Sequence, residues 1–318
     1  MGRRVSVRRL TEIVADRPVF RDVIGVLTSW DDLGLTVVPR SGAAVSFPAE
    51  LLVAGRTVPL FPARRAPLPA TGPAELELIA ARGWPAVDTE RLGEWTLRAS
   101  AGFTRRANSV LAVGDPGLPL PEAVEAARHW YEQRGLPTWI SLAEQAAPKG
   151  LAEELERHGG LHQETLLRTA PLAGLARIAG DHRRVRLSRT ADTDWMSLYR
   201  RVTDDPAVEA AARRVIHGGP SVWFATVREE GGGAPIAIGR CVVDGAWAGF
   251  GAVEVSPAAR RQGLASAMMA VLAARAAEEG ATGAYLQVEA DNGGALALYD
   301  RLGFTTSHTY QYVRLPQR

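Results

Sequence analysis

Residues 260–266 combine positive charge with small side chains at the point where a strand pattern gives way to a helix pattern. They read Arg-Arg-Gln-Gly-Leu-Ala-Ser and follow an apolar run that ends at Val255. From Leu264 and Met268 onward apolar residues recur at helical spacing, and Gly280 stands where the helix should end. A small-residue loop that leads into a helix N-terminus presents backbone N–H groups to one side. Such a loop suits an anion such as a pyrophosphate, and the two arginines add charge beside it.

A second group of residues with chemical potential follows further along the chain. Residues 286–292 read Leu-Gln-Val-Glu-Ala-Asp-Asn, an apolar strand pattern that ends in an asparagine. A helical stretch then carries Tyr299 and stops at Gly303. A phenol has a pKa of about 10 and an alkyl thiol one of about 8.5, so a tyrosine can donate a proton to a departing thiolate.

Together the two motifs resemble the signatures of the GNAT acetyltransferase superfamily. The first signature, Arg/Gln-x-x-Gly-x-Gly/Ala, is matched at Arg260, Gly263 and Ala265. The second, Asn-x-x-Ala-x-x-x-Tyr-x-x-x-Gly-Phe, is matched at Asn292, Ala295, Tyr299, Gly303 and Phe304. The resemblance covers residues 183–315. It implies an acyltransferase that moves an acetyl group from acetyl-CoA to a primary amine of a small molecule or peptide by direct transfer.

The resemblance also implies which residues bind acetyl-CoA. The expected contacts are a strand end, the loop after it and an asparagine on the next strand: Val253, Val255, Arg260, Arg261, Gln262, Gly263, Leu264, Ala265, Ser266 and Asn292. The expected general acid is Tyr299, and the N–H of Val255 is the expected donor to the reacting carbonyl oxygen. No metal is expected.

The general base is the weak point of this reading. Family members often carry a glutamate earlier on the strand, where this chain has Gly249 and Phe250. Glu254 is the nearest acid and our second catalytic candidate, although the backbone beside it should face the cofactor, which would turn its side chain away. The alternatives are Asp244, Glu289, His308, a water chain, or an amine that is already neutral and needs only positioning.

The elements that must position these motifs fall into three segments. Residues 1–62 contain five short strand patterns separated by turn signals, which predict a small all-β, SH3-like barrel. A proline-rich stretch at 61–73 is the expected linker. Residues 74–172 alternate helix and strand patterns, which indicates α/β structure, and residues 181–318 repeat that order.

The middle segment, residues 74–172, resembles a degenerate repeat of the last segment. Residues 114–121 stand where the pyrophosphate loop should be, and their prolines lack the N–H donors that an anion needs. When the middle segment is aligned with the last one, Leu155 occupies the position that corresponds to Tyr299. We therefore predict an α/β chain of tandem acetyltransferase folds with mixed central sheets, in which 74–172 is degenerate and 181–318 is catalytic. This plan is similar to that of actinobacterial tandem acetyltransferases such as mycothiol synthase, which lacks the N-terminal barrel.

Composition excludes several other classes of protein. The 318 residues are 46% hydrophobic and carry a net charge of +2, which gives no reason to expect a nucleic-acid partner. The single cysteine, Cys241, cannot form an internal disulfide and favours a reducing, cytoplasmic compartment. The N-terminal residues lack the apolar core of a signal peptide, and no apolar run is long enough to span a membrane.

The acceptor amine is not specified by these patterns. In this fold, specificity lies in the loops and the early helices, here 192–217. The alternative function is a non-catalytic acetyl-CoA sensor or a module that recruits a partner. The missing glutamate favours this alternative, whereas Tyr299 and Asn292 argue against it. A homodimer is compatible with either function.

Overall fold

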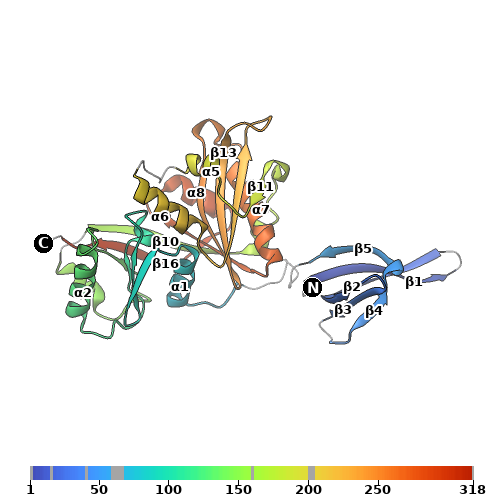
Figure 1. The fold of residues 1–318 in the computed structure, drawn as a ribbon, viewed down its shortest axis with the longest axis horizontal. Coiled ribbons are helices and arrows are strands. Elements are labelled where there is room, and N and C mark those ends of the chain that lie inside the picture. The colour runs from blue at the N-terminus through green and yellow to red at the C-terminus, as the bar shows by residue number, and fades with distance from the viewer. Residues whose placement is uncertain are drawn as a thin grey trace. The chain divides into compact units, whose positions relative to one another are not determined.

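The chain forms two compact units, which are drawn in Figure 1. The computed structural model describes residues 3–14, 17–39, 42–58, 68–158, 161–199 and 205–316, with 161–163 described by their backbone alone. One unit consists of Met1–Ala66 with Ala277–Gly280, and the other of Pro67–Ala276 with Ala281–Arg318. Most of the expected linker and the end of the helix expected at 192–202 lie outside the described residues.

The first unit is an antiparallel sheet of five strands. They are β1 (Arg4–Val14), β2 (Arg17–Trp30), β3 (Gly34–Pro39), β4 (Val45–Pro48) and β5 (Leu52–Thr57), in the spatial order β4-β3-β2-β1-β5. Its core is apolar and comes from alternating positions: Val5, Val7, Leu35, Val37 and Phe47. Over the described residues β4 and β5 are the two edges. The sheet is therefore open, not the closed SH3-like barrel that we expected, because the ladder that would join β4 to β5 is not among its pairings.

The second unit is built on one mixed sheet of eleven strands. Its first half contains α1 (Pro73–Gly83), β6 (Asp88–Leu92), β7 (Trp95–Ala99), β8 (Val110–Leu111), α2 (Leu120–Glu132), β9 (Trp139–Leu142), α3 (Leu151–Glu156) and β10 (Leu161–Pro171). Its second half contains α4 (Leu172–Leu175), β11 (Arg186–Ser188), α5 (Thr193–Leu198), α6 (Pro206–His217), β12 (Ser221–Arg228), β13 (Pro235–Asp244), β14 (Trp247–Val255), α7 (Leu264–Glu278), β15 (Gly283–Glu289), α8 (Gly293–Arg301) and β16 (Thr305–Arg314). No helix in the described part of the chain is long and apolar enough to cross a bilayer.

The strand order shows that the two halves exchange their last strands. The order is β11-β12-β13-β14-β15-β10-β16-β9-β8-β7-β6. From each edge inward the pattern is the same: antiparallel strands, then a parallel pair (β14 with β15, β8 with β9), then the last strand of the opposite half. Strands β10 and β16 meet at the centre as an antiparallel pair (Figure 1). The segments 74–172 and 181–318 therefore share one sheet.

Side-chain packing follows the same exchange. Val313 on β16 is fully buried and belongs to the core of the first half, together with Trp95 and Ile140. Leu167 on β10 is fully buried beside Tyr285 of the second half. Each half consequently depends on the other to complete its apolar core.

Buried Arg240 ties the two halves together away from the central strands. Its guanidinium donates to three carbonyl oxygens at helix ends, those of Gly83 at the end of α1 (2.8 Å), Ile216 on α6 (2.6 Å) and Gly218 after α6. Burial lowers the pKa of Arg240 to about 10, because the charged form loses hydration. The group still remains protonated at neutral pH and satisfies helix carbonyls that have no partner within their own helix.

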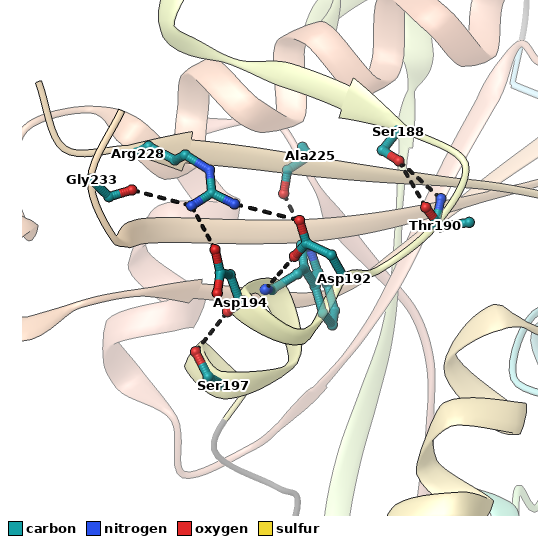
Figure 2. A network of polar contacts seen from close by, with 9 residues as sticks. Ser188, Thr190, Asp192, Asp194, Ser197, Ala225, Arg228 and Gly233 are labelled. Carbon is teal, nitrogen blue, oxygen red and sulfur yellow. Dashed lines mark hydrogen bonds and ion pairs between the residues drawn. The ribbon is translucent and has the colours of Figure 1, made fainter. Parts of the chain in front are cut away.

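Helix α5 is fixed at its N-terminus by a network of polar contacts (Figure 2). Arg228 on β12 forms ion pairs with Asp194 at 2.8 Å and Asp192 at 3.4 Å. Asp192 also caps the helix by accepting from the N–H of Trp195 at 2.7 Å, and the Trp195 indole donates to the carbonyl of Ala225. These contacts fix the direction of the helix, and Tyr199 follows its last residue.

Candidate active site

A cavity of about 220 Å³ lies where β14 and β15 separate. The two strands pair in parallel only from Trp247 with Gly283 to Phe250 with Leu286. Beyond these pairs β14 continues to Val255 and β15 to Glu289. The second half lines the cavity with residues from both strands and from α8, among them Phe250, Val253, Glu254, Glu289, Asn292 and Tyr299. The site therefore sits at the C-terminal end of a parallel pair, where open α/β sheets usually bind ligands.

A bulge in β14 sets the direction of the strand beside the gap. The register against β13 shifts between Ile238 and Arg240, and Ala252 has a positive φ of 50°. Past the bulge, the N–H of Ser256 donates to the carbonyl of Ile236 at 2.8 Å. Because successive N–H groups of a strand alternate between its two edges, the N–H of Val255 points away from β13, toward the gap.

The loop between β14 and α7 has the geometry of an anion site. Arg261 and Gly263 both adopt positive φ, 63° and 76°, which turns the chain tightly into the helix. The N–H of Ala267 donates to the carbonyl of Gly263, so the N–H groups of the three residues between them, Leu264–Ser266, precede this helical bond. The positive end of the α7 dipole lies at the same place. A pyrophosphate fits this donor set.

The arginine and glutamine of the loop make weak contacts of their own. The Arg260 side chain donates to the carbonyl of Val255 at 3.4 Å, and the Gln262 amide donates to that of Ala258 at 3.5 Å. Both side chains are exposed. These long bonds leave the side chains able to turn toward a ligand.

Asn292 lies at the cavity and caps the helix that carries Tyr299. Its side-chain oxygen accepts from the N–H of Ala295 at 3.1 Å, and it is the N-cap of α8. A capping residue orients the first turn of its helix. Asn292 therefore has a structural role as the helix cap, in addition to being a candidate for ligand binding. The sequence pattern did not indicate the capping role.

Tyr299 is half-buried at the cavity, with its ring packed edge-on against Phe304. Burial raises the pKa of its phenol to about 12, because the phenolate would lose hydration. The charge of Glu254 acts in the same direction and that of Arg106 opposes it. The phenol is therefore protonated at every pH at which an enzyme is ordinarily assayed, which is the form that a general acid needs.

Glu254 is among the residues that line the cavity, and its charge contributes to the raised pKa of Tyr299, so its carboxylate lies near the site even though its place on the strand suggested otherwise. The bulge before it changes which residues of β14 face the gap. No cation of the described residues lies within ion-pair distance of its carboxylate. Glu289, one of the other candidates, also lines the cavity, but Arg105 lies 3.5 Å from it.

The ring of Tyr285 explains why β14 has no carboxylate at Gly249, where members of the GNAT superfamily often carry a glutamate. A Cβ atom built on Gly249 would collide with the ring and hydroxyl of Tyr285. Tyr285 is itself buried and packs against Trp247. A glutamate at this position would have no room.

Two further base candidates lie elsewhere. Asp244 forms an ion pair with Arg82 at 2.7 Å, at the opposite end of β14. His308 is buried and bonds Glu77 at 2.9 Å. Within the described residues, neither side chain lines the cavity. Their positions follow from the exchanged strand β16 and from α1, which sequence patterns alone did not place.

The first half contributes one wall of the cavity, which the sequence analysis missed. Trp84, Thr104, Arg105 and Arg106 come from this half, and Thr165 comes from the exchanged strand β10. The only local signal is the Arg105-Arg106 pair in a short connection between two strand patterns. The position of these residues depends on the joining of the two halves.

The parted parallel strands, the loop at the start of α7 and the tyrosine on the next helix define an acyltransferase of the GNAT type. The model of one family, described as "Probable histone acetyltransferase Rv0428c C-terminal", matches residues 74–313. The chain belongs to this family.

Two relatives support the same class. The chain is 27% identical to the "Probable histone acetyltransferase Rv0428c" of Mycobacterium tuberculosis, over 98% of this chain and 95% of that protein. It is 26% identical to the "Uncharacterized N-acetyltransferase YobR" of Bacillus subtilis, over 76% of this chain and 98% of that protein.

Solved structures show the same fold. A GCN5-related N-acetyltransferase from Kribbella flavida superposes with a TM-score of 0.58 at 20% identity, covering 78% of this chain and 98% of its own. A tandem GNAT protein from the clavulanic acid biosynthesis pathway gives a TM-score of 0.54 at 14% identity, covering 80% and 93%. The similarity to mycothiol synthase stays a prediction.

Proposed function

We propose that this chain transfers an acetyl group from acetyl-CoA to a primary amine, with Tyr299 as general acid. The observation that carries the proposal is the cavity at the gap between β14 and β15, which brings Tyr299 and Glu254 together. The anion site at the start of α7 follows directly from the same strand. Donor binding, proton donation and proton removal can thus be assigned to neighbouring groups.

The proposed donor site extends from the loop to the gap. Residues 260–266 hold the pyrophosphate with their backbone N–H groups, and Arg260 and Arg261 add charge. The edge of β14 at Val253 and Val255 pairs with the amides of the pantetheine arm, as an added strand would, and Asn292 contacts the same arm. When bound, acetyl-CoA supplies an activated acetyl thioester.

Two side chains handle the protons in this proposal. Glu254 takes a proton from the incoming amine, and among the described residues no cation pairs with its carboxylate, which leaves that carboxylate available to the amine. Tyr299 gives a proton to the departing thiolate, and its raised pKa keeps the proton on the phenol until that moment. The N–H of Val255 donates to the carbonyl oxygen.

We further propose that the first half, 74–172, is a second acetyltransferase fold that has lost its site. Its parallel pair β8 and β9 corresponds to β14 and β15, and α2 corresponds to α7. Helix α2 begins with Leu120 and Pro121 after a proline cap, and prolines supply no N–H donor. Fully buried Leu155 lies on α3, which corresponds to α8, the helix of Tyr299.

The test is release of free CoA thiol from acetyl-CoA in the presence of pooled amines: aminoglycosides, polyamines, amino acids, peptides including a lysine-rich histone tail, and cysteinyl sugars. We expect turnover on at least one pool and a loss of roughly 10²-fold or more in Tyr299→Phe. The matched control is Tyr312→Phe, which removes another hydroxyl from the same cavity and should cost far less.

Two outcomes would contradict the proposal. Full activity of Tyr299→Phe would remove the general-acid role. Binding of acetyl-CoA without turnover on any pool would instead support a sensor of acetyl-CoA.

A further inference from the structure

Arg106 places a guanidinium in the wall of the cavity, where it lies over an aromatic ring. It lies on the 3-10 turn Arg105–Ala107, between β7 and β8 of the first half. Its guanidinium carbon lies 5.0 Å from the centre of the Trp84 ring, over which Arg240 also lies at 4.9 Å. Over the residues that the structure describes, no carboxylate lies within ion-pair distance of either arginine. Two cations on one ring make this wall electropositive.

The loop that carries Arg106 is held rigidly. Buried Asn108 accepts from the N–H groups of Ser100 and Gly102 and donates to the carbonyls of Phe103 and Thr104, at 2.7–2.9 Å. Thr104 has a φ of 56°, a strained conformation for a residue with a branched side chain. Its hydroxyl accepts from the Trp84 indole at 3.1 Å. Strain of this kind persists only where surrounding contacts impose it, and it is frequent at binding sites.

The charges of the cavity are not balanced locally. Arg105 is offset by Glu289 at 3.5 Å. Arg106 and Glu254 remain, and they come from opposite halves of the sheet. A ligand with an amine beside Glu254 and an anion beside Arg106 would complement both. The volume of about 220 Å³ is below the ~300–1,000 Å³ of pockets for drug-sized ligands, so the acceptor part inside must be small.

We propose that Arg106 of the first half binds a carboxylate of the acceptor, so that the acceptor is an amine bearing a carboxylate, of amino-acid type. The inference rests on the proposed function, since it concerns the acceptor of the same site. A guanidinium without a carboxylate partner among the described residues matches a carboxylate in charge and can bind both of its oxygens. The half that has lost its own site thus determines the specificity of the other half.

The experiment compares each of a set of L-amino acids with its carboxamide, at equal concentration, as acceptors with acetyl-CoA. The carboxamide keeps the size and the α-amine and removes only the negative charge. We expect the wild-type protein to prefer at least one acid over its amide by about 10-fold or more. Arg106→Gln should lower kcat/KM for that acid by about 10- to 100-fold, the factor for a lost charge-assisted contact, and leave the amide nearly unchanged.

Two variants control for loss of folding. Arg106→Lys keeps the charge and should retain part of the preference for the acid. Arg134→Gln removes another guanidinium that lies over a tryptophan ring, 3.6 Å from the centre of Trp130, but lines no part of this cavity. It should leave the preference intact.

Binding of the N-acetylated amino acids, measured by calorimetry, gives a second readout that needs no turnover. These products should bind the wild-type protein and bind Arg106→Gln at least 10-fold more weakly. Turnover only of amines without a carboxylate, or an equal loss on acid and amide in Arg106→Gln, overturns the inference while the proposed function stands. Absence of both turnover and product binding with every amino acid also overturns it.

Discussion

At the scale of single residues, the two carboxylates of the cavity differ in their partners. Glu289 is held by Arg105, which lies 3.5 Å away and occupies its carboxylate. In the described part of the chain Glu254 has no such cation partner, and its charge acts on Tyr299. The bulge at Ala252 sets the position of Glu254 on β14, and the ring of Tyr285 on β15 leaves no room for a side chain at Gly249.

Substitution distinguishes the two carboxylates. Glu254→Gln should lower kcat/KM by about 10²- to 10⁴-fold, the range for loss of a general base. Glu289→Gln keeps the shape and should lower it by less than about 10-fold, because its carboxylate already serves Arg105. Steady-state kinetics of both variants, measured at one saturating concentration of acetyl-CoA, would show which carboxylate acts as the base. A larger loss in Glu289→Gln would transfer the role of base to that residue.

At the scale of elements, the connection between β7 and β8 is ordered by one side chain. Asn108 supplies two accepted and two donated hydrogen bonds to backbone groups of this loop. An amide is the side chain that can do both at once, and an aspartate could only accept. The strained Thr104 and the guanidinium of Arg106 both depend on this anchor.

Removal of the Asn108 side chain should lower the stability of the folded protein. Asn108→Ala leaves buried N–H and carbonyl groups without partners, and we expect a loss of roughly 3 kcal/mol in the free energy of unfolding. Asn292→Ala is the matched control: it removes an exposed N-cap and should cost about 1 kcal/mol. Urea unfolding followed by tryptophan fluorescence measures both. Equal losses in the two variants would show that Asn108 does not anchor the loop.

At the scale of the whole molecule, the burial of tyrosine side chains raises the pKa of most of the tyrosines. Five of the six tyrosines have a raised pKa, in each case chiefly because burial disfavours the phenolate: Tyr131, Tyr285, Tyr299, Tyr310 and Tyr312. In the unfolded chain these groups titrate at about pH 10. Above that pH the unfolded chain loses protons that the folded protein keeps, so stability falls as the pH rises.

We therefore expect a nearly constant midpoint of thermal unfolding up to about pH 9.5, then a steep fall through the pKa of about 12 of Tyr299. Tyrosinate absorbance should show the same effect directly. At about pH 11 the native protein should give less than half of the tyrosinate signal of the protein in denaturant. A native signal equal to the denatured one would contradict the burial of these phenols.

Much of the candidate donor site could be predicted from the sequence, because its geometry is local. A glycine loop that enters a helix forms an anion site from consecutive residues, here 260–266. The spacing from Asn292 to Tyr299 lies within one helix and its cap. The α/β class and the family resemblance were evident for the same reason, since periodicity and motif spacing are properties of short segments.

Only the tertiary structure decided the features that depend on distant segments. The exchange of β10 and β16 joins the two halves in one sheet, and no local pattern encodes which strand becomes a neighbour. The same long-range packing buries His308 against Glu77 and brings Arg106 to the cavity of the other half. The position of Glu254 relative to the gap follows a bulge of β14 against β13. The sequence by itself determined the chemistry of the proposed donor site, whereas contacts between segments far apart in the chain determined the wall that we propose faces the acceptor.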